Sequence, residues 1–300
     1  MTFNDNITLD TGGTRRGPRG RGAAVGGLGG VGVVGAIIYF LITGQMPDLG
    51  MLTGETQTQS QQSQNENAVP LEQECRTGAD ANRNPNCRLI AGKNSLDVFW
   101  EEQLPAETGV RYSAPQMTLF SGSTATACGT GTSQMGPFYC PGDNGVYFDV
   151  TFFDQLNQIG AENNAITQLY ILAHEYGHHI QNQTGILQQV DHRSSGPNSS
   201  MVRSELQADC LAGVWIHHAS NTIDEDTGVA YLKAPTNQQL REALNAAAAV
   251  GDDRITENAG MRANPDNFSH GSAEKRMEWL NRGIQGGTIA TCDTWNVATP

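Results

Sequence analysis

The sequence predicts an α+β fold that is mainly helical, with a small sheet, behind an N-terminal transmembrane helix. Three observations support this prediction. An uncharged apolar stretch lies near the N-terminus, a segment rich in β-branched and aromatic residues lies in the middle, and two later segments carry apolar residues three or four positions apart. A chain of 300 residues provides one sizeable domain with additional segments. The 35 glycines and 7% aromatic residues indicate that part of the chain lies outside a packed core.

The apolar stretch covers residues 23–43 and follows a group of basic residues, namely Arg15, Arg16, Arg19 and Arg21. At about 1.5 Å per residue, a helix of this length spans roughly 30 Å, the thickness of a bilayer core. A cleaved signal peptide is the alternative, but the stretch is long for one and no A-x-A-like cleavage site follows it. We therefore expect an uncleaved transmembrane helix, with basic residues 1–22 in the cytoplasm.

A polar tract rich in Gln and Asn follows the apolar stretch. It lacks the apolar residues that offset the entropy of ordering, so residues 44–86 are predicted to form a flexible linker. Residues 87–300 then form the folded domain. This organisation predicts a single-pass protein of the cytoplasmic membrane, with the domain on the periplasmic or extracellular side.

Charge and cysteine content narrow the class of protein. The net charge is −13, and residues 51–300 alone carry −14, which argues against nucleic acid as a partner.

Six cysteines fit a few disulfides in an oxidising compartment. Cys75 with Cys87, and Cys128 with Cys140, are each twelve residues apart and could close short loops. Six cysteines allow about fifteen pairings, so spacing alone does not decide the connectivity.

The strongest chemical signal is the run I-L-A-H-E-Y-G-H-H-I at residues 171–180, within a predicted helix over 161–183. His174 and His178 are four residues apart, so both imidazoles project from one face of that helix. Glu175 lies about 100° round from His174, within reach of a metal-bound water. This spacing predicts two imidazole ligands for Zn²⁺ and one carboxylate that accepts a proton. Histidines that bind no metal are the alternative.

A third zinc ligand is expected downstream, in the helical pattern S-E-L-Q-A-D-C-L-A-G-V-W at residues 204–215. Glu205 and Asp209 are four apart and share a face. One can bind zinc while the other accepts the free N–H of a zinc-bound histidine. A solvated acidic face is the alternative, but the apolar neighbours disfavour it. His192, in the loop segment 191–196, remains another candidate for the third ligand.

Two flanking segments are candidates for supporting roles. Residues 145–153 are predicted to form a strand that either lines the cleft and pairs with an extended peptide or belongs to the core. His270 begins a turn that leads into a helix. Near zinc, the imidazole of His270 or the guanidinium of Arg276 could stabilise the oxyanion formed when water attacks a carbonyl. A helix cap or a buried, hydrogen-bonded histidine is the structural alternative for His270.

The sequence resembles the bacterial neutral zinc metallopeptidases. The likeness covers roughly residues 88–296, and its most specific parts are the two helical runs, H-E-Y-G-H-H-I-Q and V-R-S-E-L-Q-A-D-C-L-A-G-V-W. Three later stretches add to it, at residues 248–254, 269–276 and 292–295. The resemblance implies a zincin-like fold and an N-terminal membrane segment.

The resemblance also implies roles for particular residues. It places His174, His178 and Glu205 on zinc and makes Glu175 the general base, which leaves Asp209 to support a zinc-bound histidine. It further favours a disulfide between Cys210 and Cys292. The predicted function is therefore membrane-anchored, zinc-dependent hydrolysis of peptide bonds in a peptide or protein substrate. The alternatives are a catalytically silent zinc-binding scaffold and a zinc amidase that acts on cell-wall peptides. The identity of the substrate and the oligomeric state are not determined by the sequence.

Overall fold

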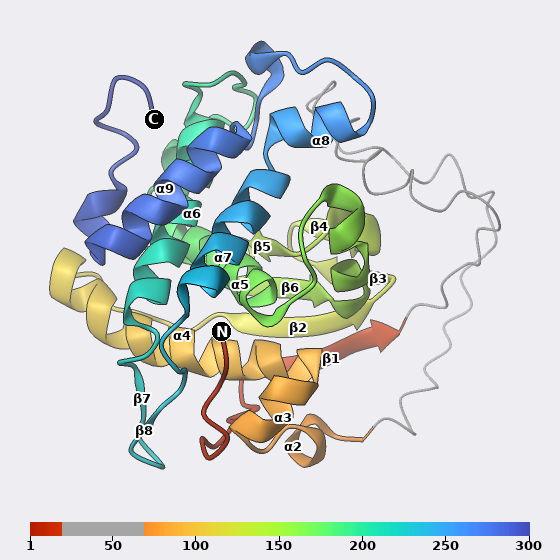
Figure 1. Ribbon diagram of the computed structural model, residues 1–300, viewed down its shortest axis with the longest axis vertical. Helices are drawn as coiled ribbons and strands as arrows, with labels where there is room; N and C mark the ends of the chain where they lie inside the picture. Colours follow the sequence, from red (N-terminus) through yellow and green to blue (C-terminus); the bar gives the residue numbers. More distant parts are fainter. Residues whose placement is uncertain (20–68) are drawn as a thin grey trace.

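The computed structural model describes residues 1–19 and 69–300, which form the mixed helix and sheet arrangement shown in Figure 1. The helices of this part of the chain are α2 (Leu71–Glu74), α3 (Gly78–Arg83), α4 (Pro85–Thr108), α5 (Ala165–Gln183), α6 (Ser200–His218), α7 (Asn237–Ala249), α8 (Asp252–Asn258) and α9 (Ala273–Gly286). The strands are β1 (Thr14–Arg19), β2 (Gln116–Ser121), β3 (Ser123–Thr126), β4 (Gly129–Thr132), β5 (Phe138–Cys140), β6 (Gly145–Asp149), β7 (Ile223–Asp224) and β8 (Val229–Ala230). The structure is a mixed helix and sheet fold, but the transmembrane helix that was part of the predicted fold class is not supported by the described residues.

The main sheet has the strand order β1-β2-β6-β5. Strands β1, β2 and β6 are parallel, with Thr118 of β2 opposite Arg15 on one side and Tyr147 on the other, and β5 pairs antiparallel with β6. The predicted strand over 145–153 is shorter than expected, because a 3₁₀ helix begins at Val150. Strand β6 is buried along its whole length, with β2 along one edge and β5 beside residues 145–147 of the other, so it belongs to the core.

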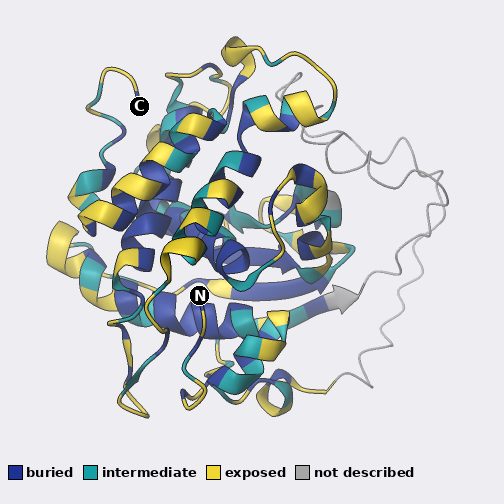
Figure 2. Cartoon of the chain, viewed as in Figure 1, coloured by how far each residue is buried: buried dark blue, intermediate teal, exposed yellow. Residues whose placement is uncertain are grey.

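Helices α4, α5 and α6 supply much of the core, with α5 packed against both of the others, and Figure 2 shows buried residues along all three. Helix α4 begins where Asn84 accepts a hydrogen bond from the backbone of Asn86, with proline at the first helical position. It ends at Gly109, whose φ of 74° is left-handed. Among the largest fully buried side chains are Trp100 of α4 and Trp215 of α6. Burying such rings supplies much of the hydrophobic stabilisation of the domain.

Helices α5 and α6 each begin at a residue whose side chain caps the helix, and their backbones are in close contact where the two helices cross. The side chain of Asn164 accepts from the amide of Thr167, and that of Ser199 accepts from Val202. At the crossing, a Cβ on Gly177 would lie 2.8 Å from both the Cα and the carbonyl oxygen of Ala208. Only glycine permits this approach, because backbone atoms cannot move aside as a flexible side chain can.

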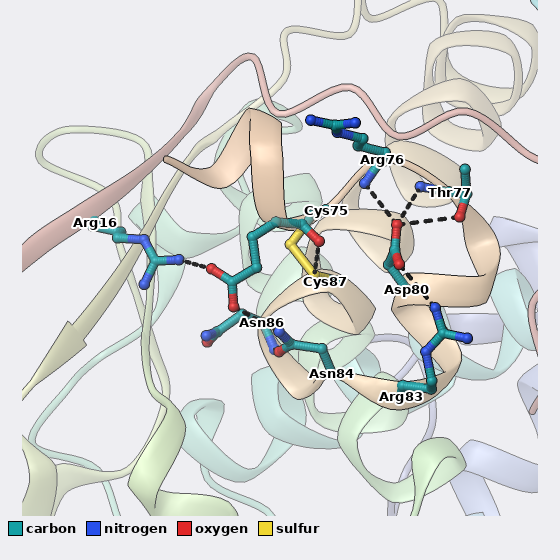
Figure 3. Close-up of a disulfide and its surroundings, with 10 residues drawn as sticks. Arg16, Cys75, Arg76, Thr77, Asp80, Arg83, Asn84, Asn86 and Cys87 are labelled. Carbon is teal, nitrogen blue, oxygen red and sulfur yellow. Dashed lines mark hydrogen bonds and ion pairs between the residues drawn. A yellow bond between two sulfur atoms is a disulfide. The ribbon is translucent and has the colours of Figure 1, made fainter. Parts of the chain in front are cut away.

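Residues 1–19 belong to the folded domain. Phe3 and Ile7 are completely buried in the main core, and β1 extends the sheet by pairing with β2. Arg16, one of the predicted cytoplasmic arginines, forms an ion pair with Glu74 beside the Cys75–Cys87 disulfide (Figure 3). The folded unit also includes α2 and α3, which lie within the predicted linker 44–86. It therefore begins well before residue 87.

The predicted transmembrane topology requires correction. Residues 23–43 lie outside the described residues, and within 1–19 and 69–300 no helix has both the length and the apolar character needed to span a membrane. A single crossing at 23–43 would also put residues 1–19 and the domain on opposite sides of the membrane. Since these two parts share one sheet and one core, the predicted cytoplasmic placement of residues 1–22 and the single-pass membrane location are wrong.

The predicted disulfide connectivity is confirmed. Cys75 is bonded to Cys87, Cys128 to Cys140, and Cys210 to Cys292. The first two bonds close short loops of twelve residues, as the spacing suggested. The third spans 82 residues and ties α6 to the C-terminal segment, as the family resemblance suggested.

The burial of Phe3 leads to a test of the N-terminal packing. We expect Phe3→Ala to lower the free energy of unfolding by about 3–5 kcal/mol, because it leaves a cavity in the main core. Urea denaturation of the full chain measures this loss. Thr2→Ala is the matched control, since the Thr2 side chain is exposed and its removal should change stability by less than about 0.5 kcal/mol. Equal stabilities for the two variants would contradict the packing described above.

Candidate metal centre

Helices α5 and α6 bring together three side chains that can hold a metal ion. One ligand atom from each of His174, His178 and Glu205 lies within 4.8 Å of the other two. The Nε2 atom of His174 is 3.3 Å from Oε2 of Glu205, and Nε2 of His178 is 3.4 Å from Oε1 of the same carboxylate. Tetrahedral zinc with bonds of about 2.0–2.2 Å places neighbouring ligand atoms about 3.3–3.5 Å apart. The two histidine–carboxylate separations are therefore compatible with a shared zinc ion.

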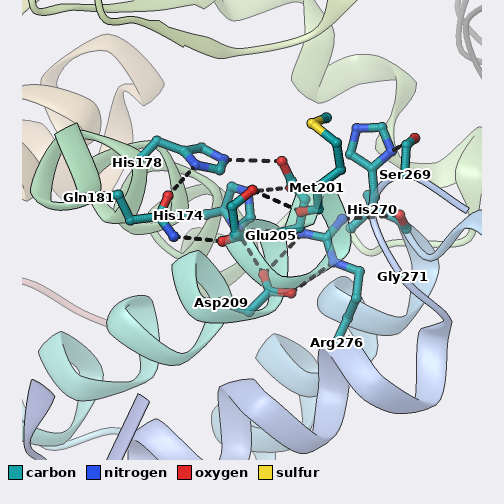
Figure 4. Close-up of polar contacts among 12 residues, drawn as sticks. His174, His178, Gln181, Met201, Glu205, Asp209, Ser269, His270, Gly271 and Arg276 are labelled. Carbon is teal, nitrogen blue, oxygen red and sulfur yellow. Dashed lines mark hydrogen bonds and ion pairs between the residues drawn. The ribbon is translucent and has the colours of Figure 1, made fainter. Parts of the chain in front are cut away.

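A buried carboxylate orients the ring of His174. Nδ1 of His174 donates to Oδ1 of Asp209 at 2.8 Å, which leaves Nε2 directed at Glu205 (Figure 4). Asp209 is completely buried and accepts further hydrogen bonds from the Tyr170 hydroxyl at 2.6 Å and from Arg276 Nε at 2.8 Å. The surrounding donors satisfy this carboxylate, so it supports His174 in the tautomer that can bind a metal.

An amide performs the same task for His178. Nδ1 of His178 lies 2.9 Å from Oε1 of Gln181, which can only accept, so the ring donates from Nδ1 and presents the Nε2 lone pair. Both imidazoles therefore present Nε2 to one carboxylate. Once both imidazoles have lost the Nε2 proton, their two nitrogens and one carboxylate oxygen form a donor set typical of catalytic zinc sites.

Burial and neighbouring charges set the protonation of the three carboxylic acids. Burial alone would raise the pKa of Glu205, but His178 and then His174 outweigh that effect and hold the pKa below its usual range. Burial likewise opposes ionisation of Asp209, and the Arg276 guanidinium lowers its pKa. For Glu175, burial dominates and raises the pKa. Glu205 and Asp209 are thus held as anions, whereas Glu175 is the carboxylate best suited to accept and release a proton.

His270 lies in a loop that is tied to a single aspartate at the start of α8. Oδ2 of Asp252 accepts from three consecutive backbone amides, those of Ser269, His270 and Gly271, at 2.8–3.0 Å. Its other oxygen, Oδ1, is 3.2 Å from Nδ1 of His270. Glycine is required at 271, where φ is +96° and the backbone packs against Leu206 of α6. Figure 4 shows His270 beside the Glu205 end of the site.

The remaining histidines lie outside this group. His179 is buried, donates from Nε2 to the Ser113 carbonyl and accepts from the Tyr139 hydroxyl, and burial lowers its pKa to about 4. His192 is exposed in its loop and does not belong to the candidate metal group. His217 and His218, at the far end of α6, bond to backbone carbonyls.

Several supporting residues had no assigned role in the sequence analysis. Tyr170 is four residues before His174 and Gln181 is three after His178, so helical spacing could have suggested both. No local signal connects Asp252 with His270, eighteen residues away. Arg276 was a candidate for oxyanion stabilisation, and the structure directs its Nε and Nη2 atoms at Asp209.

The two imidazoles and the carboxylate form a group that could hold a metal ion, with side chains around it that orient the two rings. Comparison with known sequences agrees: residues 3–295 match the family described as "putative neutral zinc metallopeptidase". The chain belongs to this family, which confirms the resemblance noted in the sequence and implies zinc as the metal.

Individual relatives extend the likeness over most of the chain. Rv2575 of Mycobacterium tuberculosis (strain ATCC 25618 / H37Rv) is 44% identical over 254 residues, which cover 83% of this chain and 85% of the relative. YpfJ of Escherichia coli (strain K12) is 40% identical over 202 residues, which cover 65% of this chain and 66% of the relative. Both are named as uncharacterized proteins. No solved structure matches the chain.

The geometry assigns different tasks to the two carboxylates of α6, and zinc retention tests them. We expect Glu205→Ala to retain almost no zinc, because only two imidazoles remain. Asp209→Asn should bind zinc about 10- to 100-fold more weakly, the usual effect of losing a partner of a zinc-bound histidine. Zinc content after dialysis against a graded chelator measures both.

The same experiment includes a control for folding and distinguishes between alternative ligand sets. Asp209 also binds Arg276, so circular dichroism must show that Asp209→Asn is folded, and Tyr170→Phe provides a milder change at the same carboxylate. If Asp209→Asn loses zinc as fully as His174→Ala while Glu205→Ala keeps it, the assignment is reversed. Full retention by both carboxylate variants would favour a third ligand elsewhere, such as His192.

Proposed function

We propose that this protein is a zinc-dependent peptidase in which His174, His178 and Glu205 hold the metal and Glu175 is the general base. The observation that carries the proposal is the convergence of the two Nε2 atoms on one carboxylate, 3.3 and 3.4 Å away, with Glu175 buried in the same helix. Membership of the zinc metallopeptidase family supports the same reaction class. The substrate is a peptide or a protein.

Glu175 moves the proton in this proposal. A bound zinc ion supplies Lewis acidity, which makes water easier to deprotonate and a carbonyl easier to attack. Glu175 accepts the proton as water attacks the scissile carbonyl and then passes it to the leaving amine. Because burial raises the pKa of Glu175, its carboxyl group can carry the proton between these two steps. The side chain is 8% exposed, so bulk water competes little for that proton.

His270 is proposed to stabilise the oxyanion. Asp252 and the Ser269 hydroxyl, at 3.2 and 3.0 Å, hold its Nδ1 side and thereby orient the ring. Burial opposes protonation of this imidazole, but the Asp252 carboxylate raises the pKa of His270. A protonated imidazole beside the metal ligands can donate to the carbonyl oxygen as negative charge develops there.

The role of Glu175 is tested by Glu175→Gln, which keeps the shape of the side chain and removes the base. We expect the variant to retain about one zinc per chain and to lose peptidase activity by at least about 100-fold. Metal analysis and hydrolysis of a generic peptide substrate measure the two properties. Glu257→Gln, an exposed site on α8, is the matched control and should be fully active.

Other outcomes have distinct meanings. An active Glu175→Gln variant, or one that has lost its zinc, would refute the assignment of this residue as the base. Zinc-loaded wild-type protein that cleaves no peptide would instead indicate a silent zinc-binding scaffold. Cleavage of cell-wall peptides without cleavage of proteins would indicate an amidase.

A further inference from the structure

The two metal-facing histidines are oriented by different parts of the chain. His174 is held by a charged group, Asp209, which also accepts from Arg276 of α9 and from the Tyr170 hydroxyl. His178 is held by the neutral amide of Gln181. An amide can be turned round, and it would then present its NH₂ group instead of its oxygen. Something must therefore keep the oxygen of Gln181 towards His178.

The contacts of Gln181 decide which way its amide faces. Its Nε2 group donates to the Ser204 carbonyl at 2.7 Å and to Oε1 of Gln207 at 3.0 Å. Both are acceptors, so the nitrogen must lie on that side and the oxygen must face His178. Gln181 is completely buried, and water cannot replace these partners. The orientation of Gln181 therefore depends partly on that of Gln207.

The C-terminal segment sets the orientation of Gln207. Nε2 of Gln207 donates to the Cys292 carbonyl at 3.1 Å, and its Oε1 accepts from the indole N–H of Trp295 at 3.2 Å. A carbonyl can only accept and an indole N–H can only donate, so this pair permits one orientation of the Gln207 amide. Gln207 is itself 5% exposed and has little access to other partners.

The C-terminal segment is in turn fastened to α6. The Cys210–Cys292 disulfide joins it to the residue directly after Asp209. The Thr294 hydroxyl donates to the Arg203 carbonyl at 2.8 Å, and the Arg203 guanidinium donates to the Val297 carbonyl at 3.0 Å. The partners of Gln207 are thus held in place by contacts that do not involve the metal ligands.

We infer that residues 292–295 act through Gln207 and Gln181 to hold His178 in the tautomer that binds zinc. A linear chain of hydrogen bonds runs from Trp295 and Cys292 to Gln207, then to Gln181 and finally to Nδ1 of His178. With Nδ1–H bonded to Gln181, the ring keeps its Nε2 lone pair for the metal. Without that bond the ring proton can lie on Nε2, which is 3.4 Å from the Glu205 carboxylate, and a proton on Nε2 blocks zinc. The inference rests on the metal site of the proposed function.

The experiment uses the full chain and two measurements that do not depend on catalysis. The first is zinc affinity by competition with a chelator. The second is the ¹⁵N chemical shifts of the His178 ring in zinc-free protein, at a pH where the ring is neutral, since these shifts distinguish an Nδ1–H from an Nε2–H tautomer. The variants are Gln181→Met, Gln207→Met and Trp295→Phe, together with the double variant of the two glutamines.

We expect wild-type protein to show the Nδ1–H tautomer at His178. Gln181→Met should weaken zinc binding about 10- to 100-fold and shift the ring towards Nε2–H. Gln207→Met and Trp295→Phe should change both readouts in the same direction by smaller amounts, because Gln181 keeps the Ser204 carbonyl. In the Gln181→Met background, Gln207→Met should change neither zinc affinity nor tautomer any further. If Gln207 served only to stabilise the fold, the double variant would instead lose zinc affinity by the sum of the two single losses.

Trp100→Phe is the matched control. The Trp100 ring is fully buried whereas Trp295 is partly exposed, so Trp100→Phe removes at least as much packing. The indole N–H of Trp100 has no acceptor among the described residues, so the change removes no hydrogen bond to Gln207. It should leave the zinc affinity and the tautomer as in the wild type. Additive losses in the double variant, an Nε2–H tautomer in the wild type, or unchanged readouts in both Gln207→Met and Trp295→Phe would overturn the inference. A protein that passes these tests yet cleaves no peptide would refute only the proposed function.

Discussion

The close crossing of α5 and α6 is the constraint on which the candidate metal centre depends. Gly177 lies between the two histidine ligands in the sequence, and the backbone of Ala208 occupies the space where its side chain would be. This contact brings Glu205, one turn before Asp209, opposite both imidazoles. The other side of α6 is held just as closely, since a Cβ on Gly213 or on Gly283 would strike the backbone of the partner helix. Helix α6 is therefore fixed between α5 and α9.

Buried polar groups around this crossing form hydrogen bonds and ion pairs with one another, which offset the cost of burying them. Asp209 is completely buried and Arg276 is 4% exposed, and each would be costly to bury without the other. Their ion pair, extended by the Tyr170 hydroxyl, links α9 to the ring of His174 on α5. An amide network starting from the C-terminal segment reaches the other ring. The three candidate ligands thus depend on side chains outside the candidate metal group, as is common for outer partners that orient metal-binding histidines.

The N-terminal segment illustrates how tertiary contacts override a local pattern. Basic residues before an apolar stretch are typical of a membrane topology signal. Here Phe3 and Ile7 are buried in the core and β1 extends the main sheet, so residues 1–19 and the domain form one folded unit. The charged side chain of Arg16 is accommodated by Glu74, a residue predicted to be in a flexible linker. Local composition could not show these contacts, because the two residues of each contact lie far from each other in the sequence.

The sequence alone determined those features that depend on helical spacing. The four-residue separations of His174 from His178 and of Glu205 from Asp209 place each pair on one helix face, and the two twelve-residue cysteine spacings pointed to short loops. Tertiary structure decided features that residue spacing does not predict. These are the shorter strand at β6, the parallel pairing of β1 with β2, and the hydrogen bonds between Asp252 and the His270 loop. It also decided which carboxylate of α6 faces the imidazole Nε2 atoms. Periodicity reports which side chains share a face, but only the packing of one helix against another determines what that face meets.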